Sequence, residues 1–79
     1  MFTQILKDTA LVNFSMKKRG SPHYIQFFSD PDDPHFIIIE LRKQKGGAIV
    51  TTHYVLKSDL NQWQSMYEKD GYKQQEAEQ

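Results

Sequence analysis

Hydrophobic and polar residues alternate through the middle of the chain in the way that half-buried β-strands require. In residues 36–43, a period of two places Ile37, Ile39 and Leu41 on the same face. Most side chains here are β-branched or aromatic, types that suit a pleated surface. We therefore predict a strand over residues 36–43 whose first face lies in the core.

The same alternation continues on both sides of this segment. It predicts three further strands, over residues 10–16, 24–28 and 48–56. Gly46 and Gly47 tolerate positive φ and predict a hairpin turn before the last strand. The acidic, proline-broken residues 29–34 predict another turn. Short connections favour an antiparallel up-and-down meander.

A helix is predicted after the fourth strand. Asp59 and Gln62 have the spacing of a capping box, which satisfies free backbone N–H groups at a helix start. Gly71 fits a left-handed C-terminal cap, with Tyr72 placed to contact Tyr67. One apolar stripe is expected to pack on the sheet, formed by Leu60, Trp63, Met66 and Tyr67.

These elements define an α+β fold, a four-stranded antiparallel β-meander with one C-terminal α-helix packed on one face. Residues 1–72 form the single domain, and the polar residues 73–79 are expected to be a disordered tail. For residues 2–8 a short helical turn and a frayed strand both remain open.

The chain has 79 residues and no cysteine, so its small core receives no help from disulfides. We therefore expect a homodimer. Lys7 and Asp8 interrupt the segment where a signal peptide needs an unbroken apolar core, and no apolar run has the length of a membrane span. We expect a cytoplasmic protein with no membrane contact.

The net charge is zero, but a meander separates the charges. Its first and third loops lie at one end of the sheet and its second loop lies at the other. The first end gathers the cations Lys17, Lys18, Arg19, Arg42, Lys43 and Lys45, and the second gathers the acids Asp30, Asp32 and Asp33. The cations either contact phosphates or are simply the solvated tips of hairpins.

The sheet face away from the core also carries large apolar side chains. One helix covers one face only, which leaves Tyr24, Phe28, Phe36 and Ile38 on the second. Aromatic residues beside cations stack the bases of single strands. A homodimer core, or burial under the N-terminal segment, is the favoured interpretation of the same residues, because aromatic residues on a small sheet more often pack than bind.

Catalytic and metal motifs are not recognisable in the sequence. His23, His35 and His53 lie in separate segments without the paired spacing of metal ligands. Neither a nucleophile arrangement nor a phosphate-binding glycine loop can be identified. We expect a non-enzymatic protein with no catalytic residue, no metal, no cofactor and no small-molecule substrate.

Residues 36–66 resemble the positive cofactor four family, small single-stranded-DNA-binding transcription cofactors. The matching residues are Ile37 to Arg42, then Leu56 to Trp63, with Met66 one turn further on. The resemblance implies a dimeric, curved four-stranded sheet followed by one helix, with single-stranded nucleic acid as the partner. It implies phosphate contacts from Lys17, Lys18, Arg19, Arg42, Lys43 and Lys45, and base stacking on Tyr24 and Phe36.

The competing hypothesis is a small protein-binding inhibitor or adaptor of the kind that phages and mobile elements encode. Its contacts with a protein target would come from the acidic loop or the open aromatic face. The candidate residues are Asp30, Asp32, Asp33, Phe28 and Ile38. Such a protein is expected to have no salt-sensitive affinity for oligonucleotides.

Overall fold

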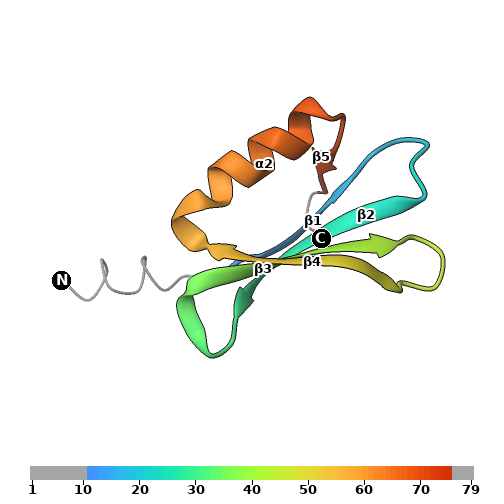
Figure 1. Ribbon diagram of the computed structural model, residues 1–79. Helices are drawn as coiled ribbons and strands as arrows, with labels where there is room; N and C mark the ends of the chain where they lie inside the picture. The colour runs from blue at the N-terminus through green and yellow to red at the C-terminus, as the bar shows by residue number, and fades with distance from the viewer. Residues whose placement is uncertain (1–10, 76–79) are drawn as a thin grey trace.

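The protein, described here for residues 11–75 of a computed structural model, is a five-stranded antiparallel sheet with one helix across one face (Figure 1). Its elements are β1 (Asn13–Lys17), β2 (His23–Asp30), β3 (Asp33–Lys43), β4 (Ile49–Leu56), the 3-10 helix η1 (Lys57–Asp59), α2 (Leu60–Lys69) and β5 (Lys73–Gln74). The predicted α+β class is confirmed. The segment 2–8, for which two structures were open, lies outside the described residues.

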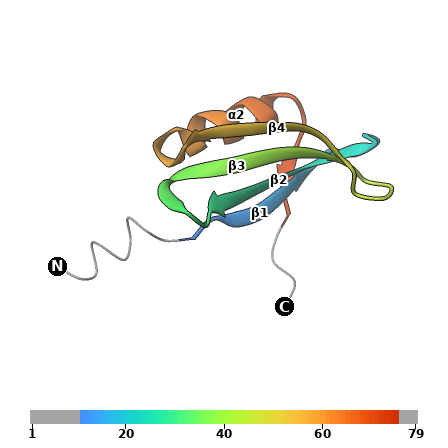
Figure 2. The same ribbon diagram turned by 60° about the horizontal axis from the view of Figure 1, so that its bottom comes forward.

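The strands follow the order β4-β3-β2-β1-β5, so β1 to β4 form the predicted meander (Figure 2). The turn between β2 and β3 is shorter than the sequence predicts, because β3 already begins at Asp33. Two carboxylates fold this turn tightly: Asp30 accepts the N–H of Asp32 at 2.9 Å, and Asp33 accepts the N–H of His35 at 3.0 Å. Hydrogen bonds from backbone N–H groups to these two side chains therefore allow a shorter turn than the one predicted.

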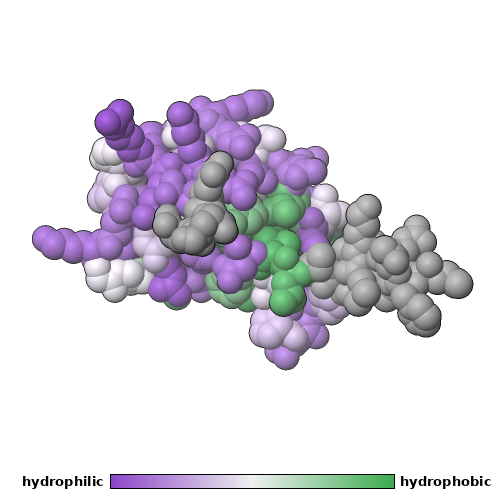
Figure 3. All heavy atoms as spheres, turned by 180° about the vertical axis from the view of Figure 1, so that it is seen from behind, coloured by the Kyte–Doolittle hydropathy of each residue, from purple (hydrophilic) through white to green (hydrophobic). Residues whose placement is uncertain are grey.

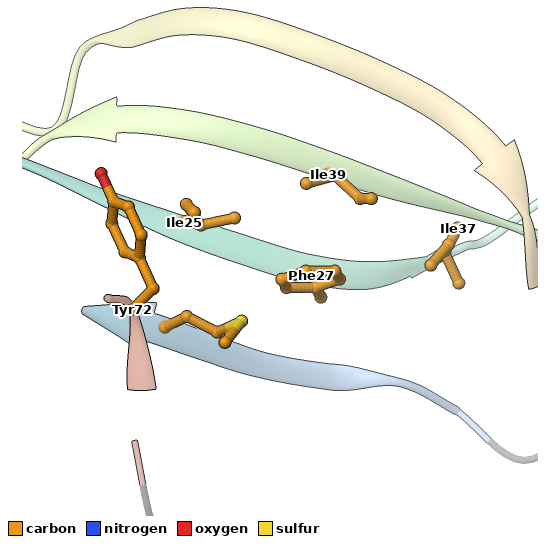
Figure 4. Packing of buried hydrophobic residues seen from close by; sticks show 6 residues of the cluster. Ile25, Phe27, Ile37, Ile39 and Tyr72 are labelled. Carbon is orange, nitrogen blue, oxygen red and sulfur yellow. The ribbon is translucent and has the colours of Figure 1, made fainter. Parts of the chain in front are cut away.

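The core lies between the sheet and α2 and consists of the side chains that the alternation predicts. Met16, Ile25, Phe27, Ile37 and Ile39 are fully buried. Figure 4 shows the β2 and β3 members side by side on one face. Phe27 is central to this layer, because its ring stacks on that of Phe14 at a centroid distance of 4.6 Å and meets Tyr67 of α2 edge-on at 6.0 Å.

The start of α2 differs from the prediction. Asp59 occupies the N-cap position, but its side chain makes no capping hydrogen bond, so the predicted capping box is wrong. The chain instead turns out of β4 through η1, whose 3-10 geometry brings the helix directly onto the sheet. Leu60, Trp63 and Tyr67 then pack against the core, whereas Met66 remains 48% exposed.

The end of α2 has the predicted Schellman geometry. Gly71 has a φ of 105°, and its N–H donates to the carbonyl of Glu68 at 3.0 Å. The N–H of Tyr72 donates to the carbonyl of Tyr67 at 3.0 Å, and the two rings meet edge-on at 6.0 Å. This ending points the chain back toward β1 and buries Tyr72.

The fifth strand was not predicted. The sequence assigns residues 73–79 to a disordered tail, but Lys73 and Gln74 pair with Lys17 and Met16 of β1. The N–H of Gln75 also donates to the carbonyl of Ser15 at 2.8 Å. These contacts use the backbone, which a hydrophobic pattern does not report, so the prediction of four strands is corrected to five. Residues 76–79 lie outside the described chain.

Adjacent phenylalanines on β2 test which face is the core. We expect Phe27→Ala to lower the free energy of unfolding by about 3–5 kcal/mol, because it leaves a cavity between the sheet and α2. Phe28→Ala changes the same residue type on the half-buried opposite face and should cost clearly less. Urea denaturation followed by circular dichroism measures the free energy of unfolding of both variants. Equal losses would contradict the assignment of the core face.

Candidate nucleic-acid interface

The sheet face away from α2 is organised in cross-strand rows that run from β1 to β4. At one end lies the row Lys17, Tyr24, Arg42 and Ile49, followed by the polar row Ser15, Gln26, Glu40 and Thr52. Next comes the row Asn13, Phe28, Ile38 and Tyr54, and beyond it Phe36 pairs with Leu56. The face thus changes from basic to polar to apolar along the strands, and we call it the open face.

Two basic hairpin turns lie together at the Lys17 end of the sheet, as Figures 1 and 2 show. They are joined directly: the Gln44 N–H donates to the Pro22 carbonyl at 2.8 Å, and its side-chain amide donates to the Ser21 carbonyl at 3.0 Å. Gly20, Gly46 and Gly47 all have positive φ and let both turns close. This end of the sheet, the basic end, therefore holds all six predicted cations.

The side chains of neighbouring lysines in the first turn go to different sides of the sheet. Lys17 lies on the open face, with its ammonium 6.0 Å from the centre of the Tyr24 ring. Lys18 lies on the helix side, where its ammonium is 5.8 Å from the centre of the Tyr72 ring. Lys17 and Tyr24 therefore share one surface, and Lys18 does not belong to it.

Arg42 also lies at the basic end, but its guanidinium is engaged by neighbouring groups. Its Nη2 lies 2.8 Å from Glu40 Oε1, its Nε donates to the same oxygen at 2.8 Å, and its Nη1 donates to the Gly47 carbonyl at 2.7 Å. Glu40 is only 8% exposed, so this partner compensates a nearly buried charge. Arg42 thus fixes the turn before β4, and most of its charge is balanced locally.

The opposite end of the open face is apolar and acidic. Phe28 and Ile38 are direct cross-strand neighbours, and the rings of Phe36 and Tyr54 stack at 4.7 Å with an interplanar angle of 4°. Tyr54 and Leu56 are 55% and 46% exposed. The side of the molecule that faces away from the viewer in Figure 1, where β1 rather than β4 is nearest, also carries a patch of hydrophobic side chains bordered by hydrophilic ones (Figure 3).

The acidic turn is tied to this end by a hydrogen bond from the Tyr54 hydroxyl to Asp30 Oδ2. That bond lowers the pKa of the Asp30 carboxyl, and the Asp32 N–H lowers it further. The same bond raises the pKa of Tyr54 to about 12. Asp30 therefore stays ionised at neutral pH and holds negative charge beside the exposed aromatic rings.

Most of the residues predicted to bind nucleic acid lie together at the basic end, whereas Phe36 lies apart from them. Lys17, Arg19, Tyr24 and Lys45 lie at the basic end and are half-buried or exposed, and Lys43 is exposed beside them at the end of β3. Phe36 lies six residues along β3 from Arg42, about 20 Å away, so Tyr24 and Phe36 do not form one stacking platform.

The predicted protein-binding residues lie together at the apolar end. Phe28, Ile38 and Asp30 are joined there by Tyr54 and Leu56, which the sequence analysis did not single out. The alternation in β4 was visible in the sequence, because a period of two places residues 52, 54 and 56 on one face, which is the open face once β4 pairs with β3. Only the register shows that Tyr54 meets Phe36 and Asp30.

Within residues 11–75, His, Asp and Glu side chains form no cluster of three that could hold a metal ion. No helix of that range has the length and apolar character needed to cross a membrane. Comparison with protein-family models, with curated proteins and with solved structures finds no match for this chain. The inference of function therefore depends on the geometry of the open face.

Removing the Tyr54 hydroxyl tests the contact at the acidic turn. We expect Tyr54→Phe to raise the pKa of Asp30 toward its ordinary value, because the largest cause of its lowering is lost. Since the folded-state pKa is depressed, the contact stabilises the protein above the unfolded-state pKa of Asp30, and that contribution is lost as the pH falls through the folded-state value. Carboxyl NMR titration measures the pKa of Asp30 in both chains.

Tyr24→Phe is the matched control, because it removes a hydroxyl from the other end of the open face. It should leave the titration of Asp30 unchanged. An unchanged Asp30 pKa in Tyr54→Phe would show that the hydroxyl does not hold the carboxylate in solution.

Proposed function

We propose that this protein is a non-enzymatic binding protein that binds single-stranded nucleic acid through the basic end of its open face. The observation that carries the proposal is the joining of two basic turns, by the Gln44 hydrogen bonds, beside the surface that Lys17 and Tyr24 share. Cations on turns supply phosphate contacts, and a half-buried aromatic ring supplies a flat surface for a base.

The arrangement favours a single strand over a duplex. A base can stack on Tyr24 only when its own face is free, which is the condition of an unpaired strand and not of the interior of a duplex. Lys17 holds its ammonium over the Tyr24 ring, 6.0 Å from the ring centre, so a base that stacks on this ring brings its phosphate close to that charge. The exposed Arg19, Lys43 and Lys45 extend the positive charge outward from this point.

A second candidate function is supported by the apolar end. Tyr54 and Leu56 are about half exposed next to the cross-strand pair Phe28 and Ile38, and the ionised Asp30 borders them. Apolar surface with a charged border is typical of a protein interface. In this alternative the protein is an inhibitor or adaptor that docks this end of the open face on a protein target.

Fluorescence anisotropy with a labelled single-stranded oligonucleotide tests the proposal. We expect binding that weakens as salt rises and that duplex competes for poorly. Tyr24→Ala should cost about 1–3 kcal/mol of binding free energy, because it removes the stacking surface. The double variant Lys17→Glu/Lys45→Glu should weaken binding further and flatten the salt dependence.

Controls separate binding from folding. Lys69→Glu reverses a charge on α2, away from the open face, and should bind as the wild-type chain does. Arg42 is unsuitable for charge reversal, because the change would leave the nearly buried Glu40 beside a second carboxylate. Absence of binding at low salt, by a chain whose circular dichroism is normal, would overturn the nucleic-acid proposal and leave the protein-target alternative.

A further inference from the structure

The two edges of the sheet are protected very differently. One edge ends in β5, which has only two residues, one of them Lys73. The other edge is β4, which has eight residues and no neighbour beyond it within residues 11–75. Between Ile49 and Leu56 there is no Lys, Arg, Asp, Glu or Pro, the residues that usually keep an edge strand from pairing.

Exposed hydrophobic side chains are concentrated on the same edge strand. Of the six large hydrophobic residues exposed in residues 11–75, four lie on β4: Ile49, Val50, Tyr54 and Leu56, which are 46–55% exposed. A register shift opposite Leu41 and Arg42 interrupts the start of β4 and leaves Thr51 to Leu56 regular. The strand thus offers both unpaired backbone groups and apolar side chains.

We infer that β4 pairs antiparallel with the β4 of a second copy of this chain, joining two sheets into one. Opposed residues in an antiparallel pair point to the same face. If both copies keep α2 on the same side, the two-fold axis must pass at a residue rather than between two residues. An axis at Thr52 or at His53 pairs the largest part of Ile49–Leu56. With the axis at Thr52, Val50 lies opposite Tyr54 of the other copy. With the axis at His53, Val50 lies opposite Leu56 of the other copy. Exposed apolar side chains therefore cover each other in both registers.

The separation of charge along the sheet makes this pairing self-complementary. Because β4 runs from the basic end to the acidic end, antiparallel pairing sets the turn with Lys45 of one copy beside the end of β4 in the other. Lys57 and Asp59 of η1 lie at that end and offset each other's charge, and the turn with Asp30, Asp32 and Asp33 lies one strand further in and makes this end acidic (Figure 1). Opposite charges therefore approach at both ends of the shared edge, and their attraction favours a second copy as occupant.

The pairing leaves both open faces exposed on one side of the joined sheet and both helices on the other. It does not depend on the nucleic-acid proposal, because the β4 edge carries neither Lys17 nor Tyr24. Lys45, in the turn before β4, belongs to both surfaces. If both proposals hold, each dimer presents two basic ends.

Sedimentation equilibrium of the full chain tests the pairing. We expect a dimer, and we expect Thr52→Lys to weaken it several-fold, because two lysines would lie opposite or diagonal to each other across the axis. Thr52→Glu should weaken it in the same way. An equimolar mixture of the two variants should restore a dimer, since the charges then attract. Ser65→Lys adds the same charge on the exposed surface of α2 and should leave the dimer intact.

Amide hydrogen exchange of the unmutated chain gives a second test that needs no folded variant. Protection of β4 should rise with protein concentration, while protection of β5 should not change. The inference would be overturned if the wild-type chain stays monomeric, or if neither Thr52 variant weakens the dimer. It would also be overturned if the mixture of the two folded variants fails to form a dimer. Exchange of β4 that is independent of concentration would overturn it as well.

Discussion

A single helix has to cover a sheet of five strands, and this constraint shapes the rest of the molecule. With ten residues, α2 is about 15 Å long, so it closes one face and leaves the other open. The covered face is apolar from β1 to β3, with Phe27 touching both its sheet neighbour Phe14 and the helical Tyr67. Because stability is concentrated on that face, the open face is free to carry basic, polar and apolar surfaces in succession.

The polar row in the middle of the open face separates two surfaces of different chemistry. Glu40 of this row neutralises Arg42 of the neighbouring basic row, and Arg42 also holds the turn before β4 through the Gly47 carbonyl. On one side lie Lys17 and Tyr24 with the basic turns. On the other side the ionised Asp30 would repel phosphates, so a nucleic acid and a protein target would use opposite ends of one face.

Sequence reasoning succeeds here where side-chain periodicity decides the structure. Alternation located the meander and its core face, and Gly71 with Tyr72 located the Schellman ending. Sequence reasoning fails where backbone pairing or strand register decides the structure. The β5 strand is held by backbone hydrogen bonds of polar residues, and the distance between Tyr24 and Phe36 follows from the register of β2 and β3, which pairs Tyr24 with Arg42. Alternation places Glu40 and Arg42 on one face, but only the structure shows that Glu40 is nearly buried and that Arg42 also donates to the Gly47 carbonyl.

The most direct test of the central claim, that the basic end of the open face is the binding surface, is an NMR titration of the isotope-labelled chain with a single-stranded oligonucleotide. We expect the largest amide and side-chain shifts at Lys17, Tyr24 and the turn around Lys45, with Phe36 and Tyr54 nearly unchanged. Shifts centred on Phe36 and Tyr54, or scattered over α2, would contradict this account.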